Sequence, residues 1–97
     1  MNISVKRSGG FAGLSQEIAA VDTTKLQPTK AGQIEQMVQN LGFFELPVRV
    51  AGETVGADFF QYDVTVTSAG QQHTVSFLDD GSAGTAPLRK LVDLLTS

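Results

Sequence analysis

The segment "DFFQYDVTVTSAGQQHTVSFL", residues 58–78, carries the clearest structural pattern in the chain. In its first half, aromatic and β-branched residues alternate with polar ones: Phe60, Tyr62, Val64 and Val66. A period of two is typical of a strand with one buried face. After a turn at "SAGQQ", the stretch "HTVSFL" resumes the alternation with Val75 and Phe77. The segment therefore predicts a β-hairpin.

The N-terminal region repeats this pattern less strongly. "NISVKR" (residues 2–7) alternates Ile3 and Val5 with polar neighbours. "LSQEIAAV" follows a glycine-rich connection and places Leu14, Ile18 and Ala20 at the same period. We expect a first hairpin whose inner face carries these apolar residues.

Two segments have helical periodicity. Pro28 suits a first helical position, and Gly42 suits a C-terminal cap. Between them lies one apolar stripe: Ala31, Ile34, Met37 or Val38, and Leu41. The closing segment "APLRKLVDLLTS" has its own stripe: Leu88, Leu91, Val92 and Leu95. We predict helices over residues 28–41 and near the C-terminus, and an irregular connection over residues 42–57, where Pro47 and the glycines oppose a long element.

The order ββαββα predicts an α+β fold, in which a four-stranded antiparallel sheet carries two helices packed on one face. The length of 97 residues fits a single domain over residues 1–97. We expect the first helix to return the chain to the end of the sheet where the first turn lies. Short uncrossed connections would then gather three segments at that end: residues 8–13, 42–57 and 79–85. Such loop clusters are the usual place for recognition.

Composition excludes several classes of function. The chain has no cysteine and a single histidine, so we expect neither a metal centre nor a cofactor. The net charge is −3 and the basic residues are scattered, which argues against a nucleic-acid partner. No apolar run approaches the length of a membrane span or a signal peptide, which predicts a cytoplasmic protein that does not bind membranes. We expect a monomer when free.

Two residue groups invite a catalytic or metal-binding interpretation, and neither supports it. His73 has no nucleophile or second histidine in a motif context, so a surface or rim histidine is the better interpretation. Asp79 and Asp80 are adjacent in "DDGS", which lacks the spaced acidic ligands of a calcium loop. We interpret that stretch as a solvated turn. Most aromatic residues, Phe60 among them, are assigned to the core.

The stretch "RSGGFAG", residues 7–13, places Phe11 among small residues in the first turn. Its ring can either fold back over the end of the sheet or project into a pocket of a partner. Gly9, Gly10 and Gly13 would allow the main chain to approach another surface closely. A protruding apolar side chain flanked by bare peptide has the features of an interface hot spot.

Taken together, "RSGGFAG", "FFELP", "GADFFQYDVTV", "HTVSF" and the leucine-rich closing helix resemble the emfourin family. Its members are small bacterial proteinaceous inhibitors of protealysin and related thermolysin-like zinc metallopeptidases. The resemblance covers nearly the whole chain, in order and at similar spacing. It implies a non-enzymatic, reversible and non-covalent inhibitor of a zinc endopeptidase encoded by the same bacterium.

The resemblance also assigns roles. Thermolysin-like enzymes favour a large apolar residue just after the scissile bond, so Phe11 is the expected anchor. Its neighbours would fit the turn into a narrow cleft: Ser8, Gly9, Gly10, Ala12 and Gly13. Asp79 and Asp80 would contact the cleft rim, or one carboxylate would approach the zinc ion of the target.

Two other functions fit the residues. A general protein-interaction module would use an exposed sheet edge and would barely depend on Phe11. A cystatin-like inhibitor of cysteine peptidases also combines strands and a helix with an N-terminal glycine. In that family, however, the helix precedes most of the sheet, and "QQHTV" lacks its glycine-containing hairpin loop. We rank the cystatin-like function lower.

Overall fold

The structure is a computed structural model that describes residues 1–9, 15–50, 60–79 and 81–96. Its strands are β1 (Asn2–Gly9), β2 (Gln16–Asp22), β3 (Arg49–Val50), β4 (Phe60–Ser68) and β5 (Gln71–Leu78). Its α-helices are α1 (Pro28–Leu41) and α2 (Ala86–Thr96), and two 3-10 turns are η1 (Thr23–Lys25) and η2 (Phe43–Glu45). Both predicted hairpins and both predicted helices are therefore confirmed.

The sheet has the strand order β2-β1-β4-β5-β3, and all neighbours are antiparallel except β3, which runs parallel to β5. The predicted α+β class is confirmed, but the predicted number of four strands is wrong, because the described residues form five. The fifth strand, β3, lies in the segment that was expected to be irregular. The two described residues of β3 pair with β5, and the Ser76 N–H donates to the Val48 carbonyl at 2.7 Å.

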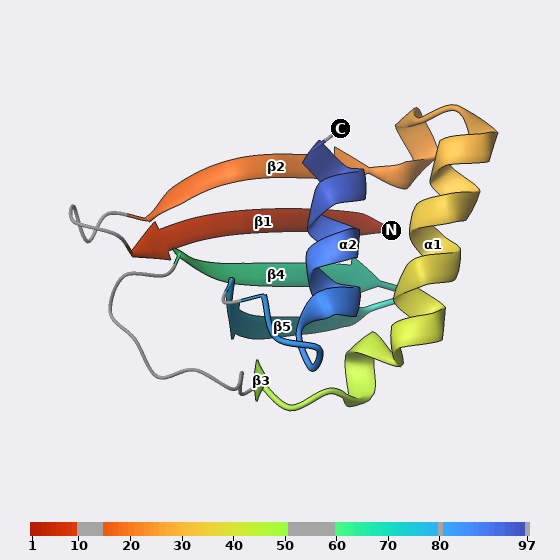
Figure 1. The fold of residues 1–97 in the computed structure, drawn as a ribbon. Helices are drawn as coiled ribbons and strands as arrows, with labels where there is room; N and C mark the ends of the chain where they lie inside the picture. The colour runs from red at the N-terminus through yellow and green to blue at the C-terminus, as the bar shows by residue number, and fades with distance from the viewer. Residues whose placement is uncertain (10–14, 51–59, 80, 97) are drawn as a thin grey trace.

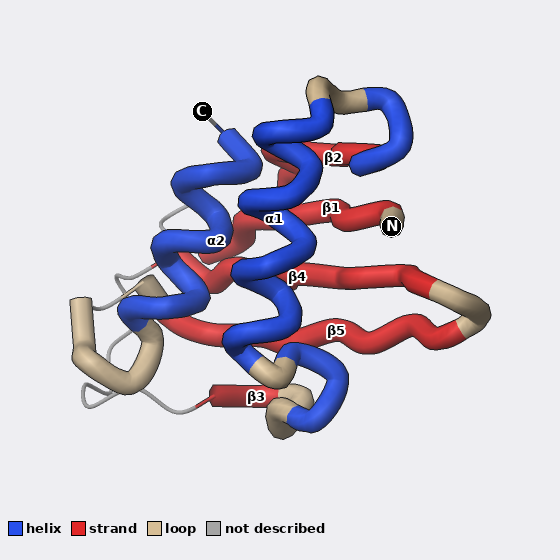
Figure 2. Tube along the Cα trace, turned by 90° about the vertical axis from the view of Figure 1, so that its right-hand side faces the viewer, coloured by secondary structure: helices blue, strands red, loops and turns tan. Residues whose placement is uncertain are grey.

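Both helices pack on the same face of the sheet and run across the strands, as Figure 1 and Figure 2 show. Helix α1 crosses from the β2 edge to the β5 edge, near the end of the sheet where the chain begins (Figure 1). The expectation that the first helix runs back to the first turn is therefore wrong. The segment after η2 performs this return, because β3 lies beside β5 and runs in the same direction.

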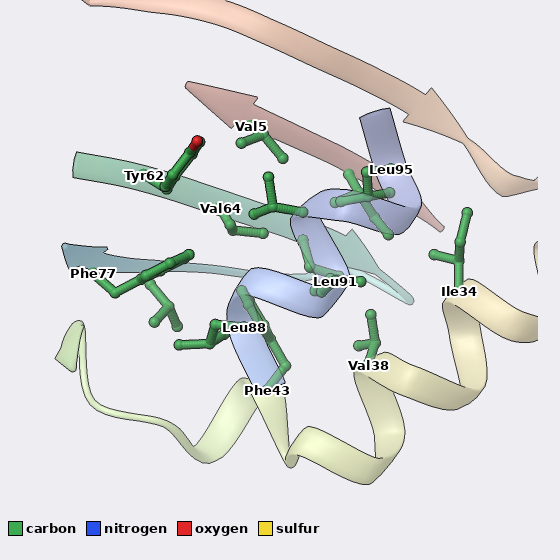
Figure 3. Close-up of a cluster of buried hydrophobic side chains, with 14 residues drawn as sticks. Val5, Ile34, Val38, Phe43, Tyr62, Val64, Phe77, Leu88, Leu91 and Leu95 are labelled. Carbon is green, nitrogen blue, oxygen red and sulfur yellow. The ribbon is translucent and has the colours of Figure 1, made fainter. Parts of the chain in front are cut away.

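The core lies between the sheet and the helices (Figure 3). From α2 it receives all four residues of the predicted stripe, each at most 6% exposed: Leu88, Leu91, Val92 and Leu95. From α1 it receives Ile34 and Val38, and Gly42 ends that helix with a left-handed φ of 61° as predicted. Burial of side chains of this size contributes about 1.5–3 kcal/mol each.

The first hairpin contains a bulge. Val5 pairs with Ala19, but Lys6 pairs with Glu17, so Ile18 is an extra residue in β2. The extra residue shifts the alternation, and Ala19 and Val21 pack against the core while Ala20 is exposed. The predicted inner face is thus right for Ile18, which packs against the core, and wrong for Ala20. Leu14 lies outside the described residues.

Ala69 is the one non-glycine residue with positive φ in the part of the chain that the structure describes. The β4–β5 turn consists of Ala69 and Gly70, at φ 51° and 80°. Two-residue hairpin turns with two positive φ values favour asparagine before glycine, because a Cβ atom strains the left-handed conformation.

We predict that Ala69→Asn raises the free energy of unfolding by about 0.5–1 kcal/mol, since asparagine tolerates this conformation better than alanine. Chemical denaturation would measure the change. Ala20→Asn, at an exposed strand position, is the matched control and should be neutral or destabilising. An unchanged or lower stability of Ala69→Asn would contradict the prediction.

A second prediction concerns Asp22, which caps η1. Its Oδ1 accepts hydrogen bonds from the Thr24 hydroxyl at 2.7 Å and from the Thr24 N–H at 3.0 Å. The hydroxyl bond, followed by the backbone bond, lowers the pKa of Asp22 below 3.8. A lowered pKa means that this stabilisation is fully present above the unfolded-state pKa of about 3.9 and is lost as the pH falls through the folded-state value.

We expect Thr24→Val to raise the pKa of Asp22 and to weaken the fold above pH about 4, with the difference from the parent disappearing in acid. An NMR titration of the Asp22 carboxyl carbon measures the pKa, and denaturation at several pH values measures stability. Thr29→Val, at an exposed position in α1, should leave the Asp22 titration unchanged. An unmoved titration midpoint in Thr24→Val would rule out the hydroxyl as its cause.

Candidate functional site

One end of the sheet, which we call the loop end, carries the residues that flank three connections. Gly9 pairs with Phe60, and Gln61 pairs with Leu78, so β1 and β5 finish here and β4 begins here. Val50 pairs with Phe77 near the same end. The Ala69–Gly70 turn lies at the opposite end of β4. The described residues next to segments 10–14, 51–59 and 80 therefore meet at one end, as the sequence predicted (Figure 1).

Strand β1 extends further into the predicted N-terminal turn than the sequence indicated. Ser8 and Gly9 belong to β1 and pair with Gln61 and Phe60. Gly9 has a φ of 102°, which a residue with a side chain rarely adopts. The other predicted contact residues of this segment lie outside the described residues: Gly10, Phe11, Ala12 and Gly13.

Asp79 lies beside this strand end and is already engaged. Its N–H donates to the Phe60 carbonyl at 2.8 Å, and its carboxylate accepts an ion pair from Arg89 Nε at 3.4 Å. Phe60 thus joins two predicted site segments, because it pairs with Gly9 on one side and binds Asp79 on the other. Asp80 lies outside the described residues.

Arg89 of α2 connects this corner to the helix layer. Besides Asp79, it pairs with Asp93 at 3.0 Å, and its guanidinium carbon lies 5.1 Å from the centroid of the Tyr62 ring. Buried Thr85 steadies the turn before α2 by donating its hydroxyl hydrogen to the Ser82 carbonyl at 3.2 Å. The connection between β5 and α2 is therefore held at both ends.

The exposed Phe60 and the half-buried Arg7 contact each other, and the sequence pattern did not indicate either as a contact residue. Phe60 was assigned to the core, but its side chain is 43% exposed. The reason is its position at the start of β4, beyond the region that the helices cover (Figure 1). The guanidinium carbon of Arg7 lies 4.6 Å from the centroid of the Phe60 ring. The alternation placed Phe60 on the correct face, but periodicity does not show where along a strand the cover ends.

The other aromatic residues that were assigned to the core and that the structure describes follow the prediction. Phe43, Tyr62 and Phe77 are buried, Phe44 is half-buried, and Tyr62 stacks on Phe77 with 5.5 Å between the ring centroids. Phe59 lies outside the described residues.

His73 has a structural role. It is half-buried, its Nε2 lies 2.7 Å from the Leu46 carbonyl, and its ring contacts Phe43 and Phe44 at centroid distances of 5.8 and 6.4 Å. A carbonyl only accepts hydrogen bonds, so Nε2 is the donor. His73 therefore fastens the segment after α1 to β5, and it lies away from the loop end.

Other features of the described chain offer little chemistry. Its residues include no group of three or more histidine, cysteine or acidic side chains that could hold a metal ion. Neither α1 nor α2, the two α-helices described, is long and apolar enough to cross a bilayer. One open hollow lies on the uncovered sheet face, beside Ser4, Ala20 and Thr65, and others lie along the helix pair, beside Met37 and Asn40.

Comparison with known proteins supports one family. Neither the curated proteins nor the solved structures contain a match to this chain. A family model described as Emfourin matches residues 5–96, which includes every helix and nearly all of the sheet. Members of that family are known as inhibitors of protealysin-like metalloproteases and are not enzymes. On the strength of this match, the chain belongs to the Emfourin family.

Proposed function

We propose that this chain is a reversible, non-covalent inhibitor of a bacterial thermolysin-like zinc metallopeptidase, and that it blocks the active-site cleft with the segments at the loop end. The family match over residues 5–96 carries this proposal. The described residues that flank three connections meet at one end of the sheet, which supports it, since recognition segments are usually carried on such a scaffold. We take the free inhibitor to be a monomer that acts as one domain.

Phe11 is the proposed anchor. It lies two residues after Gly9, the last residue of β1, which has a positive φ. Thermolysin-like enzymes favour a large apolar residue after the scissile bond, and a phenylalanine among small neighbours meets that preference. The adjacent contact residues in this proposal are Ser8, Gly9, Gly10, Ala12 and Gly13.

The pairing of β1, the strand that precedes Phe11, supports inhibition without cleavage. Strand β1 pairs with β4 at every position from Asn2 to Gly9, so the base of the segment is fixed on the central strand. Binding by a segment with a fixed base costs less conformational entropy. A fixed peptide also resists movement into the geometry that hydrolysis requires.

Asp79 and Asp80 are the proposed contacts to the rim of the cleft. Asp79 is oriented by Arg89 and by its backbone bond to Phe60. Because this carboxylate already has a cationic partner, we favour a contact with the rim over direct approach to the zinc ion of the target.

The alternative of a general interaction module relies on an exposed sheet edge. Edge strand β2 is interrupted by the Ile18 bulge, and bulges hinder pairing with another strand. This feature favours the inhibitor function. We place the action of the inhibitor in the cytoplasm, where it would restrain a peptidase before that enzyme is needed.

The proposal predicts that the parent chain abolishes cleavage of a short fluorogenic peptide by a thermolysin-like peptidase, and that it does not affect a cysteine or a serine peptidase. Phe11→Ala should raise the inhibition constant about thirtyfold or more, as expected for an aromatic hot spot. Dilution of the complex should restore activity, and the inhibitor should be recovered intact. Absence of inhibition at micromolar concentration would contradict the proposed function.

A further prediction separates the rim contact from general charge effects. Asp79→Asn should raise the inhibition constant several-fold, because it weakens both the proposed contact and the attachment to Arg89, whereas Asp80→Asn tests the neighbouring carboxylate. Asp93→Asn is the matched control, since Asp93 also pairs with Arg89 but lies within α2. Equal inhibition by the three variants and the parent would remove both aspartates from the interface.

A further inference from the structure

Phe60 is an inward-facing aromatic residue of β4 that is only partly covered. Only Phe60 and Val48 are exposed among the large hydrophobic residues that the structure describes, at 43% and 65%. The next inward-facing residues of β4, Tyr62 and Val64, are buried. Phe60 lies at the loop end, beside Gly9, which is one of the residues proposed to contact the peptidase.

Arg7 lies over the Phe60 ring. Its guanidinium carbon lies 4.6 Å from the ring centroid, within the range of a cation–π contact. Within the described residues, no acidic group pairs with Arg7, although the chain has more acidic than basic residues. Arg89, by contrast, binds two carboxylates.

The two residues lie on the face of the sheet that carries the helices, next to the proposed contact segments. Arg7 pairs with Tyr62, and Gly9 pairs with Phe60, so the Arg7 and Phe60 side chains meet diagonally across β1 and β4. Phe60 also binds Asp79 through its carbonyl. Any partner that covers both Gly9 and Asp79 therefore approaches the ring.

We propose that Arg7 and Phe60 form a second contact with the peptidase, in which Arg7 binds a carboxylate on the rim of the cleft and Phe60 packs on an adjacent apolar side chain. This inference rests on the proposed inhibitory function. The Arg7 guanidinium offers a planar set of donors that matches a carboxylate, and the ring beneath it limits the loss of side-chain entropy on binding. Arginine and aromatic residues are also the types enriched among interface hot spots.

The competing interpretation is local packing, in which the ring merely covers Gly9 and Arg7 merely covers the ring. The two interpretations differ in what substitution changes. Local packing affects only the stability of the free inhibitor, whereas a contact affects the inhibition constant at temperatures where every variant is fully folded.

The experiment titrates a thermolysin-like peptidase with the parent and with Phe60→Ala, Arg7→Met and Arg7→Lys, well below the thermal midpoint of each variant. Val48→Ala is the control for Phe60, since it shortens the other exposed hydrophobic residue. Lys6→Met is the control for Arg7, because it removes a neighbouring positive charge from the opposite face of the sheet. Thermal unfolding of each free variant is measured in parallel.

We expect Phe60→Ala and Arg7→Met each to raise the inhibition constant about tenfold or more, and the controls to change it less than about twofold. Arg7→Lys should lie between the parent and Arg7→Met, because lysine keeps the charge and loses the planar donor set. The effect of Arg7→Met should shrink when the salt concentration rises from about 0.05 to about 0.5 M, and that of Phe60→Ala should persist.

Two results would overturn the inference in distinguishable ways. If the parent inhibits and both Phe60→Ala and Arg7→Met inhibit equally well, the function stands and the second contact does not exist. If the parent inhibits no thermolysin-like peptidase, the proposed function fails and this contact fails with it.

Discussion

Burial of the inward face of β4 is the constraint on which the rest of the structure depends. This strand is paired on both sides, with β1 and with β5, and its residues Tyr62, Val64 and Val66 are at most 4% exposed. Helix α2 supplies the cover through its leucine and valine stripe (Figure 3). Loss of this contact would leave both hairpins without a common core, because isolated two-stranded hairpins are marginally stable in water.

The limited reach of that cover explains the candidate site. Both helices cross the strands instead of running along them, so the strands extend past the helix layer at the loop end (Figure 1). Phe60, an inward-facing residue at the start of β4, is consequently 43% exposed, whereas Tyr62, two residues further along the same face, is buried. The packed core thus borders a partly exposed surface at the loop end.

Two polar contacts, one on the segment before β3 and one on the connection after β5, attach these segments to the rest of the fold. His73 binds the Leu46 carbonyl and positions the segment that leads to β3. Arg89 joins α2 to Asp79 at the loop end. In both contacts, a polar donor is paired with an acceptor at the edge of the core. They position the two segments without burying further apolar side chains. Preorganisation of this kind lowers the entropy lost when an inhibitor binds.

The sequence by itself determined the α+β class, both hairpins, both helices and most of the core, because each of these follows from the local period of apolar residues and from residues such as Pro28 and Gly42. It also located the three connections at one end, and the combination of its motifs indicated the family that the later comparison confirmed. The Ile18 bulge, β3, the crossing of the helices and the exposure of Phe60 required the tertiary structure. Each of these features depends on how far one element covers or pairs with another. Packing between residues far apart in the sequence sets that extent, and the local period of apolar residues carries no information about it.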